Sequence, residues 1–150
     1  MKNEKKKFNT SEIFTLALQN HQKNNLKTAE NFYRETINLN SNHSESYFLL
    51  GTLLAQRKNF NEAKQLLNRA IEIHPNYPDA YYNLGNIQRE LGDIKKAINS
   101  FQKTIELQPN YVEAHHSLGL MFIELGELKK AINSFQKTIE LQPNYADAHQ

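Results

Sequence analysis

Apolar residues recur along this chain at the spacing of an α-helix, and the pattern repeats every 34 residues. Within one period, positions 4, 7, 8 and 11 fall on one helical face, and in the second period they are Tyr47, Leu50, Gly51 and Leu54. A second run follows at positions 17, 20, 24 and 28, where the same period has Phe60, Ala63, Leu67 and Ile71. Each period therefore predicts two amphipathic helices.

Helix-breaking residues separate these predicted helices. Gly92 and Gly126 lie between the two runs of the third and fourth periods, and the segments KNNL and RKNF take their place earlier in the chain. Proline disfavours helical geometry in the residue before it, so Pro75, Pro109 and Pro143 should end the second helices. The first period has Asn40-Ser41-Asn42 at that place instead. Each period is thus predicted to fold as a helix–turn–helix hairpin.

One segment of the chain occurs twice without any change. KKAINSFQKTIELQPNY runs from Lys95 to Tyr111 and again from Lys129 to Tyr145. A single globular core gives each of its parts a different environment, whereas a stack of equal units offers the same environment repeatedly. We therefore expect four units, at residues 10–43, 44–77, 78–111 and 112–145. A disordered basic tail (residues 1–9) is expected before them, and the start of a truncated fifth unit (residues 146–150) after them.

Small residues occupy one position on each helix of the predicted hairpins. Position 20 is alanine in all four units, and position 8 is Ala17, Gly51, Gly85 or Gly119. Glycine inside a helix costs about 1 kcal/mol relative to alanine, so its recurrence indicates a packing requirement. We expect these residues to let the two helices of a hairpin approach closely.

This combination of period and residues resembles the tetratricopeptide repeat family over residues 10–145. The third unit fits best, although Gln88 and Thr104 stand where an aromatic residue and alanine are usual; the matching residues are Tyr81, Leu84, Gly85, Ala97, Phe101 and Pro109. The resemblance implies an all-α fold, a right-handed superhelical solenoid of hairpins. It also implies a protein-interaction scaffold, and the units resemble the long arrays of the O-linked N-acetylglucosamine transferases.

Composition narrows the class of protein. The chain has no cysteine, which excludes disulfides, zinc–thiolate sites and a cysteine nucleophile. Its net charge of +2 comes from lysines near the N terminus, so the rest is close to neutral and predicts no nucleic-acid partner. No signal peptide or membrane-spanning run is visible, and we expect a cytoplasmic protein.

No catalytic motif is present in the sequence. It has no phosphate-binding glycine loop, no His-Glu-x-x-His and no nucleophile elbow, so we expect no catalytic residues and no cofactor. His115 and His116 are adjacent and would point about 100° apart on a helix, so we expect no metal site there. His115 falls at an inward position and is predicted to be packed.

The resemblance implies that the first helices of the hairpins line the concave, partner-binding side. The side chains expected there are Phe14, Phe48, Thr52, Tyr82, Asn83, Asn86, Arg89, His116 and Leu120. Amides both donate and accept hydrogen bonds, so Asn83 and Asn86 could hold an extended peptide backbone. The alternatives are that they are ordinary exposed asparagines and that the apolar members only pack between helices.

Two binding modes known in the family fit this face poorly. Chaperone-binding members grip an acidic C terminus with a clamp of lysine and asparagine, and here only Asn83 matches that clamp. The asparagine ladder of the glycosyltransferase arrays is likewise reduced to Asn83. The partner therefore cannot be named from these positions.

The function predicted from the sequence is a scaffold that binds a peptide or partner protein in its groove. One alternative is the substrate-recruiting array of a larger enzyme, such as a glycosyltransferase; another is RNA binding, which the near-neutral body disfavours. We also expect that the last hairpin, which lacks a polar cap, permits self-association.

Overall fold

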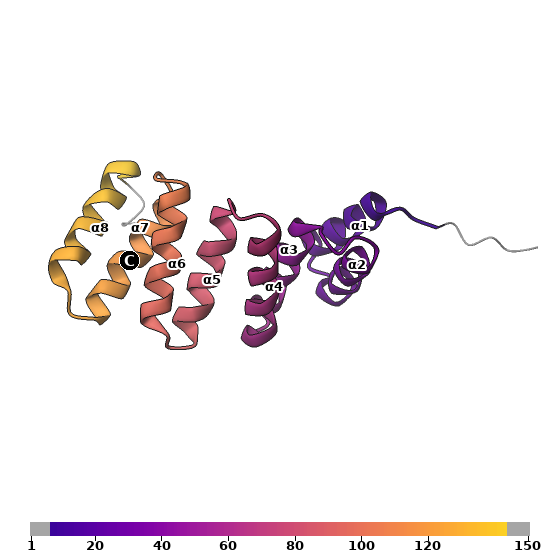
Figure 1. Cartoon of the computed structure of the whole chain (residues 1–150), viewed down its shortest axis with the longest axis horizontal. Coiled ribbons are helices and arrows are strands. Elements are labelled where there is room, and N and C mark those ends of the chain that lie inside the picture. The colour runs from indigo at the N-terminus through magenta and orange to yellow at the C-terminus, as the bar shows by residue number, and fades with distance from the viewer. Residues whose placement is uncertain (1–6, 144–150) are drawn as a thin grey trace, which may run out of the picture. The chain divides into compact units, whose positions relative to one another are not determined.

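The computed structural model of the chain describes residues 7–143, and over these residues it contains eight α-helices and no strand. Figure 1 shows them as successive antiparallel hairpins. The helices are α1 (Thr10–Gln22), α2 (Leu26–Leu39), α3 (Ser44–Gln56), α4 (Phe60–Ile73), α5 (Pro78–Glu90), α6 (Ile94–Leu107), α7 (Val112–Glu124) and α8 (Leu128–Leu141). The all-α class and the helical hairpins predicted from the sequence are confirmed. The N-terminal part of the basic tail and the start of the fifth unit lie outside the described residues.

The chain divides between Pro75 and Asn76 into two compact bodies. The first holds α1 to α4 and the second holds α5 to α8. Within each body, the main contacts join helices that follow one another in the chain. Each body therefore has one junction between hairpins, α2 with α3 in the first and α6 with α7 in the second.

The helices begin and end where local chemistry requires it. Before α1, the side chain of Asn9 accepts from the backbone N–H of Glu12 at 2.8 Å, and the Glu12 carboxylate accepts from the N–H of Asn9. Proline opens α5 at its first position, where its missing N–H costs nothing. The second helices α4, α6 and α8 each end two residues before a proline, as predicted.

Every hairpin turn contains one residue with a left-handed backbone. These residues are Asn24 (φ 62°), Lys58 (φ 63°), Gly92 (φ 81°) and Gly126 (φ 75°). The N–H of the residue that follows each of them closes the turn, as in Asn59 to the carbonyl of Leu54 at 2.9 Å. The sequence segments KNNL and RKNF thus perform the same turn as the two glycines.

Of these four residues, Lys58 is the least suited to a left-handed backbone, and replacing it should change the stability of the protein. A residue with a Cβ in left-handed geometry is strained by about 1–2 kcal/mol. We expect Lys58→Gly to raise the free energy of unfolding by roughly 0.5–1 kcal/mol, after the extra flexibility of glycine in the unfolded chain is subtracted. Asn24→Gly is the matched control and should gain less, because asparagine tolerates this region. Equal gains in urea denaturation at both sites would contradict the strain assigned to Lys58.

Small residues mark the closest packing within each hairpin. The alanines at position 20 are Ala29, Ala63, Ala97 and Ala131, and none is more than 2% exposed. An added Cβ on Gly85 would lie 2.6 Å from the ring of Phe101, so the space at position 8 is filled by the opposing side chain. The steric role predicted for the glycines at this position is confirmed: the opposing side chain is a phenylalanine ring at Gly85 and Gly119, and Leu67 at Gly51.

The periodic position 28 proved less buried than the sequence suggested. Ile105 is half-buried and Ile139 is 51% exposed, whereas position 27 is fully buried in all four hairpins. That position holds threonine in three of them, and Thr104 donates from its hydroxyl to the carbonyl of Ser100 at 3.0 Å. The polar group is satisfied inside its own helix, so the threonine methyl can join the core.

Candidate functional site

Side chains of α5 supply the centre of the face expected to bind a partner, called here the first-helix face. It consists in the second body of Tyr82, Asn83, Asn86, Arg89, His116 and Leu120. The four from α5 are half-buried, and Leu120 on α7 is 37% exposed. Ile123, one turn beyond Leu120, is 48% exposed. The face thus combines two amides and a guanidinium with accessible aliphatic side chains.

Tyr82 is held in an aromatic cluster at one end of this face. Its ring centroid lies 5.7 Å from that of Phe101 on α6 and 5.1 Å from that of Tyr111, which directly precedes α7. The Tyr111 hydroxyl donates to the Asp79 carboxylate of α5 at 2.5 Å. The pKa of Tyr111 is raised mainly by burial and further by the Asp79 carboxylate, so the hydroxyl stays protonated. The cluster therefore fixes the start of α7 against the start of α5.

His116 on α7 takes the same register position as Tyr82. Its ring lies 5.7 Å from that of Phe135 on α8, edge to face. Its neighbour His115 points elsewhere, is 8% exposed, and contacts the Pro109 carbonyl through Nε2 at 2.8 Å. The two imidazoles thus have different surroundings, and the packed role predicted for His115 is confirmed.

The first body offers a more aromatic version of the face. Phe14 on α1 lies with its ring 4.6 Å from that of His43 and 6.3 Å from that of Tyr33. On α3, Phe48 and Thr52 are half-buried, and the Thr52 hydroxyl donates to the Phe48 carbonyl at 2.9 Å. Phe14 therefore supports the packing of its own hairpin as well as lining the face.

His21 and Tyr33 form a partly buried polar contact between α1 and α2. Nδ1 of His21 lies 2.8 Å from the Tyr33 hydroxyl, and Tyr33 is fully buried. Burial lowers the pKa of His21 and raises that of Tyr33 to about 12. Both groups are therefore neutral near pH 7, and the contact joins two uncharged partners.

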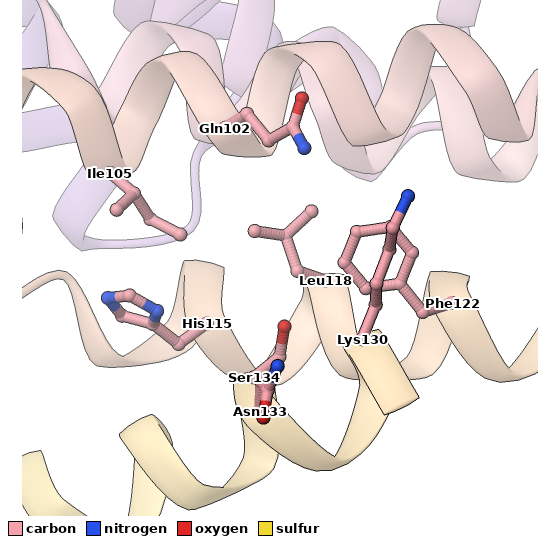
Figure 2. Close-up of a pocket in the computed structure, with 8 residues that line it drawn as sticks. All are labelled: Gln102, Ile105, His115, Leu118, Phe122, Lys130, Asn133 and Ser134. Carbon is pink, nitrogen blue, oxygen red and sulfur yellow. The ribbon is translucent and has the colours of Figure 1, made fainter. Parts of the chain in front are cut away.

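A cavity of about 320 Å³ lies over α7, between α6 and α8. Figure 2 shows Ile105 and Gln102 from α6 facing His115, Leu118 and Phe122 from α7, with side chains of α8 on the other side. The α8 members are Lys130, Asn133 and Ser134. This cavity uses positions 4, 7 and 11 of α7, whereas the first-helix face uses positions 5 and 9.

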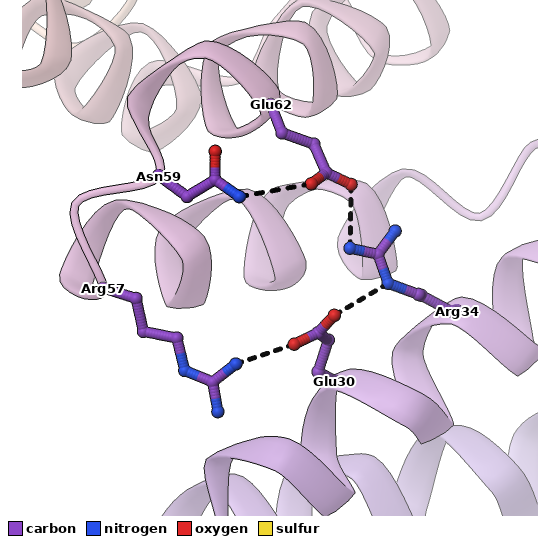
Figure 3. Close-up of polar contacts among 5 residues, drawn as sticks. All are labelled: Glu30, Arg34, Arg57, Asn59 and Glu62. Atoms are coloured by element: carbon purple, nitrogen blue, oxygen red, sulfur yellow. Dashed lines mark hydrogen bonds and ion pairs between the residues drawn. The ribbon is translucent and has the colours of Figure 1, made fainter.

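The corresponding junction of the first body carries a network of ion pairs (Figure 3). Glu30 on α2 accepts from Arg34 Nε at 3.0 Å and from Arg57 Nη1 at 2.7 Å. Arg34 also donates to Glu62 on α4 at 2.7 Å, and Asn59 donates to the same carboxylate at 3.4 Å. The network joins α2 to α4 and to the turn that precedes α4.

The charge state of Glu30 should be visible in the pH dependence of stability. Burial would raise its pKa, but the hydrogen bond from Arg34 and the charges of Arg34, Lys27 and Arg57 together lower it below the usual value. Because the pKa of Glu30 is lower in the folded than in the unfolded state, its ionised carboxylate stabilises the fold. This contribution is fully present above the unfolded pKa of about 4.3, and it is lost as the pH falls through the pKa of the folded state.

We therefore expect wild type to lose more stability than Glu30→Gln as the pH falls from about 5 to 3. Urea denaturation of both proteins across this range measures the difference, and shared carboxylates cancel in the comparison. Glu72→Gln is the control, since the Glu72 side chain is 66% exposed in its pair with Arg69. Parallel curves for wild type and Glu30→Gln would show that the network does not shift this carboxyl group.

Sequence reasoning did not find the Tyr111–Asp79 contact, the ion-pair network or the cavity. The charged partners Arg34 and Glu62 are 28 residues apart, and a single sequence does not show which charges pair. One signal was available for the buried threonines, because three of the four units have threonine at position 27. Within residues 7–143, no cluster of three potential metal-ligating side chains occurs, and no helix has the length and apolar character of a membrane span.

Family models match much of the chain. The model described as tetratricopeptide repeat matches residues 78–111 and 112–145, and one described as TPR repeat matches residues 51–91. The boundaries of all four expected units stay a prediction. No curated protein sequence matches the chain significantly.

Solved structures resemble the chain over most of its length. The crystal structure of MamA is 27% identical with a TM-score of 0.86, over 93% of this chain and 81% of MamA. YrrB, a TPR protein with an unusual peptide-binding site, is 26% identical with a TM-score of 0.82, over 93% and 72% of the two chains. A MamA fragment from Desulfovibrio magneticus RS-1 is 23% identical with a TM-score of 0.83, over 91% and 77%, and shows the shared fold. With its hairpins, turns and small-residue positions, the chain belongs to the tetratricopeptide repeat family.

Proposed function

We propose that this chain is a protein-interaction scaffold that binds an extended peptide segment on its first-helix face. The observation that carries the proposal is the run of half-buried amides and Arg89 on α5, beside the exposed Leu120 and Ile123 of α7. Amides and a guanidinium can bind backbone carbonyls and carboxylates, while the aliphatic side chains desolvate an apolar residue. The likeness to YrrB supports a peptide as the ligand.

The aromatic cluster favours binding without large rearrangement. Tyr82 and Tyr111 are fixed by ring contacts and by the bond to Asp79, so the start of the face is preorganised. Asn83, Asn86 and Arg89 lie along the next turns of the same helix, at a spacing that can follow an extended backbone. Nothing in this site or in the comparisons favours the alternative of a recruiting array in a glycosyltransferase.

The test uses peptides selected from a random display library on the wild-type protein. Their affinities are then measured by fluorescence anisotropy for wild type, Asn83→Ala/Asn86→Ala and Arg89→Ala. Loss of two hydrogen bonds should weaken binding about tenfold. Asn99→Ala, an exposed asparagine on α6, is the matched control and should bind like wild type. Selected peptides that bind the double variant as tightly as wild type would refute the proposed face.

We also propose that α8 mediates self-association. Leu128, Ile132 and Ile139 are 63%, 55% and 51% exposed, and they follow one another at helical spacing. Sedimentation across concentration should show a dimer that Ile132→Lys abolishes, whereas Lys129→Ala on the same helix leaves it intact. A strictly monomeric wild type would contradict this part. A cytoplasmic location and a preference for protein over nucleic acid stay predictions from composition.

A further inference from the structure

The cavity over α7 has an apolar floor. Leu118 and Phe122 are 5% and 7% exposed, and Ile105 of α6 is half-buried beside them. Figure 2 shows the Leu118 and Ile105 side chains directed into the same space. Such a floor gains most from contact with an aromatic or branched aliphatic group.

The same register in the first body is bridged across its two second helices. In the first body, Arg34 stands at position 25 of one unit and Glu62 at position 19 of the next, and their guanidinium and carboxylate groups lie 2.7 Å apart. In the second body these positions are Gln102 and Lys130, on opposite sides of the cavity. Position 23 also changes, from Leu66 to the smaller Ser134. The second body thus has Gln102 and Lys130 where the first has an ion pair, and serine where the first has leucine, and the cavity lies at this place.

One cation, already paired with a glutamate of its own helix, lines the cavity. Lys130 is the charged residue among those that line it, its side chain is 64% exposed, and no carboxylate is among them. Its Nζ lies 3.0 Å from Glu127 on its own helix and 5.7 Å from the centre of the Phe122 ring. Asn133 and Ser134 add further hydrogen-bond donors on the same side. The ammonium group therefore stands at the edge of the apolar floor, where a second carboxylate would share it with Glu127.

The size of the cavity limits the kind of ligand. Sites for small molecules and cofactors span about 300–1,000 Å³, so 320 Å³ lies at the lower end. The cavity is open to solvent, so it suits a segment that lies across it and places one large side chain and part of its neighbour inside.

We propose that this cavity is a second binding site, which takes a partner segment in which an aromatic or branched aliphatic residue is followed by aspartate or glutamate. The apolar side chain packs on Leu118 and Phe122, and the carboxylate pairs with Lys130. The lining residues differ from those of the first-helix face, so a partner can engage both surfaces or either one alone. The site goes beyond the proposed function, and the experiments that test it do not depend on binding at the first-helix face.

The probe is the capped peptide acetyl-Gly-Phe-Asp-Gly-amide, titrated to about 10 mM because ligands of this size bind with a Kd on the order of 1 mM. Methyl NMR should show saturable shifts of the Ile105 and Leu118 resonances, while Leu120 on the first-helix face stays unchanged. The Phe-Asn peptide should bind about two- to fivefold more weakly, since an ion pair to an exposed lysine contributes modestly. Gly-Ser-Asp-Gly, which lacks the apolar group, should not bind.

Two variants rebuild the first-body chemistry in the second body. Ser134→Leu should fill the cavity and Gln102→Arg/Lys130→Glu should bridge it, so both should abolish the shifts while melting like wild type by circular dichroism. Lys130→Ala should weaken the Phe-Asp peptide alone. Lys137→Ala removes another α8 lysine that also pairs with a glutamate, at 3.6 Å, and should bind like wild type.

Absence of methyl shifts at about 10 mM peptide would overturn the proposal, because a built site should bind at the affinity expected for this size. Equal affinity for the Phe-Asp and Phe-Asn peptides would overturn the role of Lys130. Shifts confined to Leu120 would assign the peptide to the first-helix face and refute the second site. Binding that survives Ser134→Leu would show that the peptide sits outside the cavity.

Discussion

Replacing Ile98 with alanine should lower the free energy of unfolding by about 2–4 kcal/mol, whereas the same change at Ile132 should cost less than about 1 kcal/mol. The two isoleucines lie in identical stretches of sequence, at the same place in α6 and α8. Ile98 is 8% exposed and packs in the core formed with Leu118, Met121 and Phe122 of α7. Ile132 is 55% exposed. The surrounding packing, and not the local sequence, decides the cost.

Urea denaturation of the two variants measures this difference directly. Helix propensity contributes equally at both positions, because the flanking residues are the same. If both variants lose the same free energy of unfolding in a monomeric sample, Ile132 on α8 must be buried much as Ile98 on α6 is. Equal losses that appear only at high protein concentration would instead support self-association through α8.

The second large effect is expected at Gly85, where alanine should destabilise the protein by about 1–2 kcal/mol. An added Cβ would lie 2.6 and 2.8 Å from two ring atoms of Phe101, which is fully buried and cannot turn away. Overpacking of this kind costs about 1–3 kcal/mol, and the better helix propensity of alanine returns about 1 kcal/mol at most. Chemical denaturation again provides the measurement.

Gly51→Ala is the matched control for Gly85. There the nearest atoms are the Leu67 Cγ at 3.0 Å and the Ala63 carbonyl oxygen at 3.2 Å, so the clash is milder and the net change should lie within about 0.5 kcal/mol of zero. Phe101→Leu gives Gly85 the leucine partner that Gly51 has. In a protein that carries this substitution, Gly85→Ala should therefore destabilise much less. If Gly85→Ala stays equally damaging there, the Phe101 ring is not the obstacle.

The hairpins were predictable because each depends on residues close together in the chain. Gly92 and Gly126 adopt the left-handed backbone at the predicted turns, and the second helices end before the predicted prolines. Thr104 was harder to place in the core, since its polar hydroxyl hides a buried methyl from a search for apolar periodicity. Its bond to the Ser100 carbonyl becomes evident only in the folded helix.

The chemistry between hairpins could not be derived in the same way. Arg34 and Gln102 occupy the same register position, yet one joins an ion pair to Glu62 and the other lines an open cavity. The difference depends on which residue stands opposite, on a helix some 28 residues away. The nine residues assigned to the binding face remain a prediction: eight are half-buried, which fits both packing and binding, and Leu120 is exposed.

The exact duplication of residues 95–111 at 129–145 has a consequence for the length of the array. If residues 95–128 were excised, Ile94 would be followed by Lys129, and the sequence across the new join would be the one that α6 already has. The α5–α6 hairpin would be reproduced with every local contact intact, so the shortened protein should fold without a foreign junction. Insertion of a further copy would be equally seamless. Units of this chain can thus be lost or gained whole, and the number of repeats becomes a heritable variable that changes without creating a new sequence at the join.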